Sequence, residues 1–137
     1  MKKVLVIDDE IEIQALIANF LRNYGVHVEA YANGLQASKK IKIRNYDLII
    51  TDLKMPEEDG FSIVYKARYI WPNTRKTPII IITGTGKEAH FEIMNCNLNQ
   101  HRMKILKKPF EMEKLLEAVC EAFHLEYEKI KDSMVIA

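Results

Sequence analysis

The sequence has few of the features that mark disulfide-rich, membrane-spanning or nucleic-acid-binding proteins. Its two cysteines, Cys96 and Cys120, lie in separate helix-like segments without C-x-x-C spacing, so we expect reduced thiols, not a disulfide or metal site. No apolar run approaches the ~18 residues that span a bilayer, and no signal-peptide core follows Met1. Twenty basic and nineteen acidic side chains give a formal charge of +1. We therefore expect a cytoplasmic protein that neither inserts into membranes nor binds nucleic acid directly.

The composition is that of a single globular domain. Hydrophobic residues make up 48% and charged residues 28% of the 137 residues, a balance typical of folded and not of disordered proteins. A chain of this length buries roughly two-thirds of its unfolded surface in one core. We expect the domain to span residues 1–128, with 129–137 forming a C-terminal tail or the start of a linker.

Short apolar runs alternate with segments of helical periodicity along the chain. The apolar runs predict strands, and the i, i+3, i+4 spacing of apolar residues predicts helices. Strands are expected at 4–7, 26–30, 47–51, 79–82 and 103–106, and helices at 13–24, 35–44, 61–70, 91–98 and 112–127. This order predicts an α/β fold with a doubly wound, five-stranded parallel sheet of order 2-1-3-4-5 and five helices, in three α/β/α layers.

Polar residues follow four of the predicted strands. Asp8 and Asp9 end the first strand, Asp52 the third, Thr83 the fourth and Lys108 the fifth. In a doubly wound sheet, ligands bind beyond the carboxyl ends of the strands, at the switch point between strands one and three. An acid after a strand can simply cap the next helix. Three crowded carboxylates, however, call for a compensating lysine or a hard cation, so the set predicts a site for magnesium, or for manganese in its place.

These residues stand in motifs that resemble the receiver domain of two-component response regulators, over essentially the whole chain. The motifs are Asp8-Asp9 after a Val-Leu-Val-Ile strand, the loop 52–60 (DLKMPEEDG), Thr83-Gly84 after four isoleucines, and Lys108-Pro109-Phe110. The resemblance implies a phosphoprotein that works as a switch in phosphorelay signal transduction. Its phosphodonor would be a sensor histidine kinase or a phosphotransfer protein.

The resemblance also implies a role for each acid. Asp52 would be the phosphoacceptor that becomes an aspartyl phosphate. Asp9 and Asp52 would bind magnesium directly, together with the backbone carbonyl of Lys54, and Asp8 would act through a water molecule. A carboxylate is a competent nucleophile toward phosphorus once a cation neutralises the approaching oxygens.

The remaining motif residues would bind the phosphoryl group or shape the site. By the resemblance, Lys108 would pair with the phosphoryl group, Thr83 would move its hydroxyl onto a phosphoryl oxygen, and Gly84 would leave space for it. The proline that follows selects Lys108 over its neighbour, because the family places lysine directly before proline, often with a cis peptide bond. Residues expected to set only the turns of the loops are Met55, Pro56, Gly60 and Pro109.

Two features depart from the family pattern. Ile105 stands three positions before the lysine, where the family often has an aromatic switch residue, so no aromatic rotamer change is expected. The segment 87–104 lacks the usual small-residue turn, which predicts an irregular fourth helix. We expect phosphorylation to change the face made by the fourth helix, the fifth strand and the fifth helix, through which a second copy or an effector would bind.

Lys54 and Thr85 would border the path of the hydrolysing water. Neither is a strong general base at neutral pH, so the domain is expected to catalyse its own phosphorylation and only slow dephosphorylation, without being an enzyme for other substrates.

Two other interpretations stay open. Residues 84–89 (GTGKEA) match G-x-G-x-x-A, a loose dinucleotide-binding fingerprint, but the motif falls in the fourth unit and no acid ends the next strand to hold a ribose. The chain could also be a receiver-like interaction module without phosphotransfer. Phosphate gain from acetyl phosphate and magnesium separates both interpretations from a phosphoacceptor.

Overall fold

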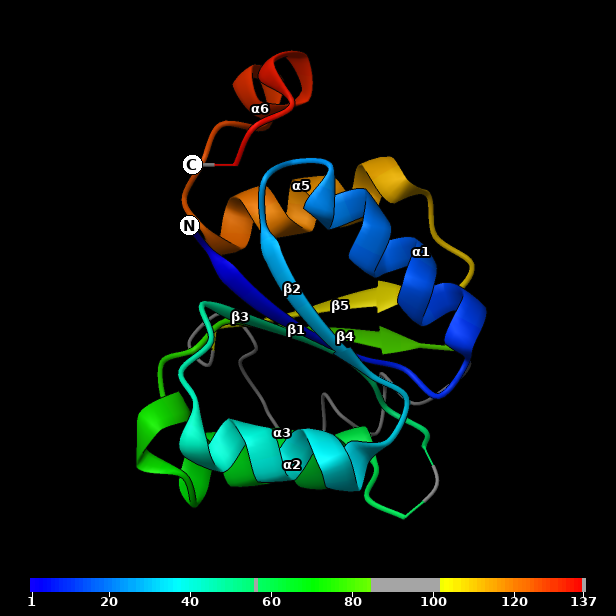
Figure 1. The fold of residues 1–137 in the computed structure, drawn as a ribbon, viewed down its shortest axis with the longest axis vertical. Coiled ribbons are helices and arrows are strands. Elements are labelled where there is room, and N and C mark those ends of the chain that lie inside the picture. The colour runs from blue at the N-terminus through cyan, green and yellow to red at the C-terminus, as the bar shows by residue number, and fades with distance from the viewer. Residues whose placement is uncertain (56, 85–101, 137) are drawn as a thin grey trace.

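The computed structural model describes residues 1–55, 57–84 and 102–136. Five strands form one sheet, and helices cover both of its faces (Figure 1). The strands are β1 (Lys3–Ile7), β2 (His27–Tyr31), β3 (Leu48–Asp52), β4 (Ile79–Thr83) and β5 (Met103–Lys107). The helices are α1 (Ile11–Arg22), α2 (Gly34–Ile43), α3 (Gly60–Tyr69), α5 (Met112–Ala122) and α6 (Tyr127–Ser133), with a 3-10 turn, η1 (Pro72–Thr74). The helix expected at 91–98 lies outside the described residues.

The sheet confirms the predicted fold class. All neighbouring strands pair in parallel, in the order β2-β1-β3-β4-β5. In register, Val6 lies beside Ile50, and Ile50 beside Ile80. Strands β1, β3 and β4 are buried along almost their whole length, which explains why they read as continuous apolar runs and not as alternating ones.

The sheet separates two hydrophobic cores. Helices α1 and α5 lie on one face of the sheet, and α2 and α3 lie on the other (Figure 1). Alternate residues of each strand point to opposite faces, so Val4 and Val6 enter the α1–α5 core while Leu5 and Ile7 enter the α2–α3 core. Cys120 is free and buried in the α1–α5 core, whereas Cys96 lies outside the described residues.

Short-range signals set the helix ends. The side chain of Asn33 accepts hydrogen bonds from the backbone of the first turn of α2, and the side chain of Asp59 accepts one from Ser62 N at 3.0 Å in α3. Gly25, with φ +81°, closes the turn after α1. Within the described ranges, no helix combines the length and apolar character that a bilayer span requires.

The C-terminal part of the chain differs from the prediction of one helix over 112–127. Helix α5 ends at Ala122, the backbone turns at His124 with φ 56°, and Tyr127 begins the separate helix α6. After α6 the chain returns to the body of the domain. Ile136 is 2% exposed there, and its backbone N–H donates to Tyr24 O at 2.8 Å. The predicted domain limit at residue 128 stays a prediction.

Candidate functional site

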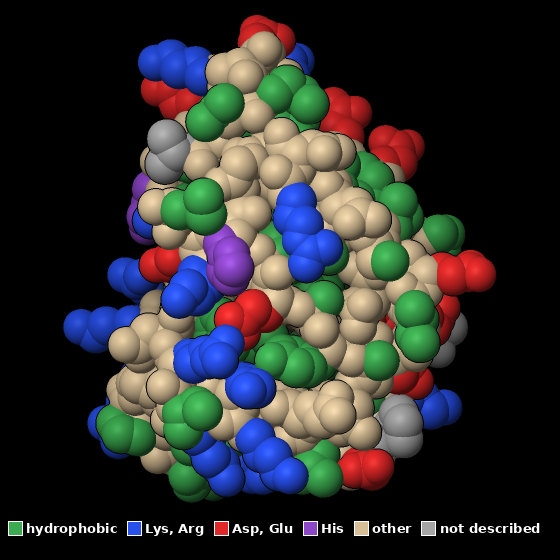
Figure 2. All heavy atoms as spheres, viewed as in Figure 1, with side chains coloured by type: hydrophobic (Ala, Val, Ile, Leu, Met, Phe, Trp, Pro, Cys, Tyr) green, Lys and Arg blue, Asp and Glu red, His purple; other side chains and the backbone are tan. Residues whose placement is uncertain are grey.

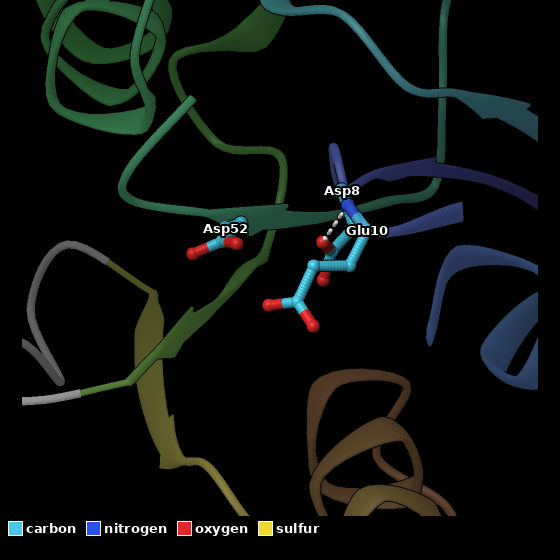
Figure 3. A group of neighbouring side chains, drawn as sticks. All are labelled: Asp8, Glu10 and Asp52. Atoms are coloured by element: carbon cyan, nitrogen blue, oxygen red, sulfur yellow. Dashed lines mark hydrogen bonds between the residues drawn. The ribbon is translucent and has the colours of Figure 1, made fainter. Parts of the chain in front are cut away.

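Three carboxylates meet at the carboxyl ends of β1 and β3. Oxygen atoms of Asp8, Glu10 and Asp52 all lie within 4.8 Å of one another (Figure 3). Asp8 follows β1 and is fully buried, and Asp52, the last residue of β3, is 5% exposed. Because β1 and β3 are neighbouring parallel strands, their ends reach the same edge of the sheet. The predicted convergence of Asp8 and Asp52 follows directly from this topology.

A single lysine faces all three carboxylates. Lys108 Nζ lies 3.1 Å from Asp8 Oδ2, 3.0 Å from Glu10 Oε1 and 3.1 Å from Asp52 Oδ2. The Lys108-Pro109 peptide bond is cis. Three negative charges around one ammonium group leave the site with a net negative charge. That charge favours a cation that can share the carboxylate oxygens.

The electrostatic environment shifts two of these groups in opposite senses. Burial raises the pKa of Asp8 to about 6, and the charge of Asp52 adds to this effect, while the N–H of Glu10 and the ammonium of Lys108 oppose it. Burial alone would lower the pKa of Lys108. Its bonds to Glu10 and Asp52 outweigh that effect, so its pKa is raised and the lysine stays charged.

Thr83 lies at the end of β4, beside this cluster in the fold. It is 1% exposed, and its Oγ1 is buried without a hydrogen-bond partner among the described residues. Its backbone carbonyl accepts a hydrogen bond from Lys108 N at 2.8 Å, which ties the ends of β4 and β5 together. A Cβ built on the next residue, Gly84, would contact nothing within 4 Å among the residues that the structure describes.

The loop after Asp52 begins and ends against β3. Gly60 N donates to Leu53 O at 2.8 Å, and a Cβ on Gly60 would collide with the Asp52 carbonyl, so only glycine fits here. Met55 is buried in the α2–α3 core. The side chain of Lys54 is exposed, and the backbone N–H of Lys54 donates to Asp52 Oδ1 at 3.4 Å. Pro56 lies outside the described residues.

The middle of the same loop is anchored by Glu58, a residue that the sequence did not single out. Its carboxylate pairs with Lys66 Nζ at 2.6 Å and accepts hydrogen bonds from the hydroxyls of Ser62, at 3.2 Å, and Ser38. Its backbone carbonyl lies against Gly34, where any Cβ would collide with it. Glu58 therefore fastens the loop that follows Asp52 to both α2 and α3.

The structure brings together a carboxylate set that differs in one member from the predicted one. Asp9, expected as a direct metal ligand, is exposed and is not one of the three acids that come within 4.8 Å. Glu10 takes part instead, because its N–H donates to Asp8 Oδ1 at 2.9 Å and folds the loop back over the strand end. In the sequence, the position of Glu10 directly after Asp8 and Asp9 was the feature that could have indicated its place in the cluster.

Comparison with known proteins gives consistent matches. Residues 4–120 match the family model of the response regulator receiver domain. The transcriptional regulatory protein ResD of Bacillus subtilis is 38% identical over 88 residues, which are 64% of this chain and 35% of ResD. The response regulator receiver protein CpdR of Brucella abortus is 29% identical over 120 residues, which are 87% of this chain and 94% of CpdR. The chain thus spans about a third of ResD and nearly all of CpdR.

Solved structures match over the same region. Chemotaxis protein CheY4 of Vibrio cholerae has a TM-score of 0.76 and 32% identity, covering 89% of this chain and 98% of that one. The receiver domain of the sensor histidine kinase PA1611 of Pseudomonas aeruginosa, solved with a magnesium ion coordinated in its active-site cleft, has a TM-score of 0.74 and 29% identity, covering 90% and 98%. Since the family match runs from β1 into α5 and includes every strand, this chain belongs to the receiver domains of two-component response regulators.

Proposed function

We propose that the domain accepts a phosphoryl group on Asp52 from the phosphohistidine of a sensor histidine kinase or phosphotransfer protein in the cytoplasm. Receiver domains of two-component systems are phosphoacceptors that act as phosphorylation-dependent switches. The observation that carries the residue assignment is the position of Asp52, which ends a central strand and has Lys108 Nζ 3.1 Å from its Oδ2. Asp8 is buried behind the same lysine, and Glu10 is on an exposed loop.

The donor atoms at this site fit a hard divalent cation. Carboxylate oxygens from two strands converge there, and the buried Asp8 Oδ2 pairs with Lys108 Nζ at 3.1 Å but accepts no well-oriented hydrogen bond in the described part of the chain. Mg²⁺, or Mn²⁺ in its place, would be held by Asp9, Asp52 and the backbone carbonyl of Lys54, with Asp8 acting through water. When bound, the ion would neutralise the oxygens of the incoming phosphoryl group.

The transfer itself is a displacement at phosphorus. An Oδ atom of Asp52 attacks the phosphorus, an O–P bond forms, and the N–P bond of the donor phosphohistidine breaks, with its electron pair returning to the ring nitrogen. Lys108 exchanges its contact with Asp52 Oδ2 for a phosphoryl oxygen, and the hydroxyl of Thr83 donates to another. Positioning and charge compensation by these residues are the main sources of rate.

Loss of the phosphoryl group is slow in this proposal. Lys54, next to the phosphoacceptor loop, is a cation at neutral pH and cannot remove a proton from water. Thr85 lies outside the described residues. The domain therefore catalyses its own phosphorylation and slow dephosphorylation, and it has no other substrate.

The proposed readout uses the face that includes β5 and α5. A second copy or an effector protein would bind there after phosphorylation. Ile105 of β5 is half-buried against the α2–α3 core, and it offers an aliphatic contact where the family often has an aromatic one. The helix expected on the other side of β5 lies outside the described residues.

Intact mass after incubation with acetyl phosphate and Mg²⁺ tests the proposal. We expect one added phosphoryl group, lost in Asp52→Asn and in the presence of EDTA. Phosphate gain by Asp52→Asn at the native rate would refute the site, and nucleotide binding without phosphate gain would favour a cofactor-binding domain. Comparing Asp9→Asn with Glu10→Gln decides which acid completes the metal site, since only the true ligand shifts the Mg²⁺ concentration required.

A further inference from the structure

Charge is distributed unequally between the two helical layers of the domain. The segments 32–46 and 60–78, which contain α2, α3 and η1, hold eight basic and no acidic side chains. The segment 111–133, which contains α5 and α6, holds seven acidic and three basic side chains. The near-zero net charge of the chain therefore combines basic α2, α3 and η1 segments with an acidic α5–α6 segment, and α2 and α3 lie across the sheet from α5 (Figure 1).

Several of these cations are already used within the domain. Arg44 pairs with Glu29 at 2.7 Å, Lys66 pairs with Glu58, and Arg68 is buried and donates to backbone carbonyls near η1. The other five form no ion pair with an acid of the described ranges: Lys39, Lys40, Lys42, Arg75 and Lys76. Three of them are on α2, and two follow η1, whose Asn73 donates to Ile41 O at the end of α2.

The same side of the domain exposes large hydrophobic side chains. Of the ten that the described residues expose, five belong to α2, α3 or the residues directly after α3: Leu35, Ile43, Tyr65, Tyr69 and Ile70. The rings of Tyr65 and Tyr69 lie 5.2 Å apart, centroid to centroid, on the outer side of α3. Figure 2 shows Lys, Arg and hydrophobic side chains gathered over the lower part of the molecule, where Figure 1 places α2 and α3. We call this surface the α2–α3 face.

We propose that the α2–α3 face binds an acidic, partly apolar segment of a partner protein, separately from the switch face at β5 and α5. Unpaired lysines supply charge complementarity for glutamate or aspartate. Exposed tyrosine and isoleucine side chains supply apolar area of the kind enriched at protein interfaces.

Two other occupants fit the surface less well. A nucleic-acid backbone offers no counterpart for the aliphatic side chains of Ile43 and Ile70, and the acidic α5–α6 layer weakens long-range attraction to a polyanion. A second copy in a closed, two-fold dimer would place the lysines of both copies opposite each other. Pairing the basic layer of one copy with the acidic layer of another would give a head-to-tail contact, which does not form a closed dimer.

Binding of a synthetic helical peptide, with glutamate on one face and leucine on the other, tests the proposal with the full chain. We expect it to bind and to shift the NMR signals of α2 and α3. The triple variant Lys39→Gln, Lys42→Gln, Lys76→Gln should weaken binding by about tenfold or more, because it removes three of the five cations that form no ion pair with an acid of the described ranges. The matched triple variant Lys114→Gln, Lys129→Gln, Lys131→Gln changes the net charge equally but should bind as tightly as the native chain. All six lysines replaced in the two triple variants are exposed.

A second variant separates the apolar contribution from charge. Tyr65→Ser with Tyr69→Ser should also weaken peptide binding, while urea unfolding and phosphorylation of Asp52 stay as in the native chain, since both rings are half-exposed. Equal loss of binding in the two lysine variants would overturn the proposal. So would peptide signals that map outside α2 and α3, tighter binding of a single-stranded oligonucleotide than of the peptide, or self-association that the first triple variant abolishes.

Discussion

Replacing the buried Asp8 by asparagine separates the cost of its charge from its role toward a metal. Burial and the Asp52 charge raise the pKa of Asp8 from 3.8 to about 6 in the folded domain. A carboxyl group with a higher pKa in the folded than in the unfolded chain holds its proton more tightly when folded. Ionising Asp8 therefore lowers the free energy of unfolding, and this loss grows as the pH rises from about 4 through about 6.

The pKa difference gives the size of the effect. A rise in the pKa of Asp8 from 3.8 to about 6 corresponds to a loss of about 3 kcal/mol in the free energy of unfolding. This loss is complete above about pH 6.5 and absent below about pH 4. Asparagine has the same shape and no charge, and Lys108 keeps its partners Glu10 and Asp52. We expect Asp8→Asn, without divalent cations, to be more stable than the native chain by up to about 3 kcal/mol at pH 7.5, with most of the difference lost near pH 4.5.

Urea unfolding with a chelator, at both pH values, measures this difference. The single tryptophan, Trp71, is 7% exposed and reports unfolding by fluorescence. Asp132→Asn removes an exposed charge and serves as the matched control, with little change expected at either pH. Adding Mg²⁺ should stabilise the native chain more than Asp8→Asn, since only the native chain keeps the carboxylate. A variant that loses stability at pH 7.5, or changes equally at both pH values, would refute the argument.

Three further substitutions test two anchors of the loop after Asp52 and the anchor of the C-terminal segment. Glu58→Ala should lower the free energy of unfolding by about 1–3 kcal/mol and slow phosphorylation, because it frees the loop after Asp52. The neighbouring, exposed Glu57→Ala should change neither quantity. Urea unfolding and phosphorylation rates measure the two effects. Ile136→Ala should cost about 2–4 kcal/mol in urea unfolding while phosphorylation continues. Gly60→Ala should impair folding and phosphorylation, because a Cβ there would collide with the Asp52 carbonyl. Gly84→Ala should leave thermal unfolding nearly unchanged, because a Cβ there meets nothing within 4 Å among the described residues.

The sheet and the two central acids were predictable because both depend on local patterns and chain order. Continuous apolar runs identify buried parallel strands, and right-handed crossovers then leave few strand orders. Once β1 and β3 are neighbours, Asp8 and Asp52 must approach each other. Glu10 could not be placed in this way, since its position depends on the turn that its own N–H makes onto Asp8 Oδ1. Glu58 depends on contacts with α2 and α3, which a loop sequence does not encode.

The C-terminal segment shows where periodicity alone misleads. The apolar stripe of α5 continues through Phe123 and Tyr127, yet the helix ends at Ala122. His124 takes a positive φ without being glycine, so no ordinary stop signal marks the turn. The burial of Ile136 is equally hidden, because three apolar residues near a chain end predict neither a strand nor a helix.

The end of β4 links the proposed phosphoryl site to β5 through the backbone. Thr83 O accepts from Lys108 N, and Thr83 lies beside Lys107 in the strand register, so a shift of Thr83 also moves the end of β5. Strand β5 is at the sheet edge and is paired only with β4 in the described residues, which lets it move without disturbing a further strand. Ile105 lies two residues earlier in β5, beside Ile81. This ladder connects the site to the proposed switch face directly, so a response does not require an aromatic side chain at position 105.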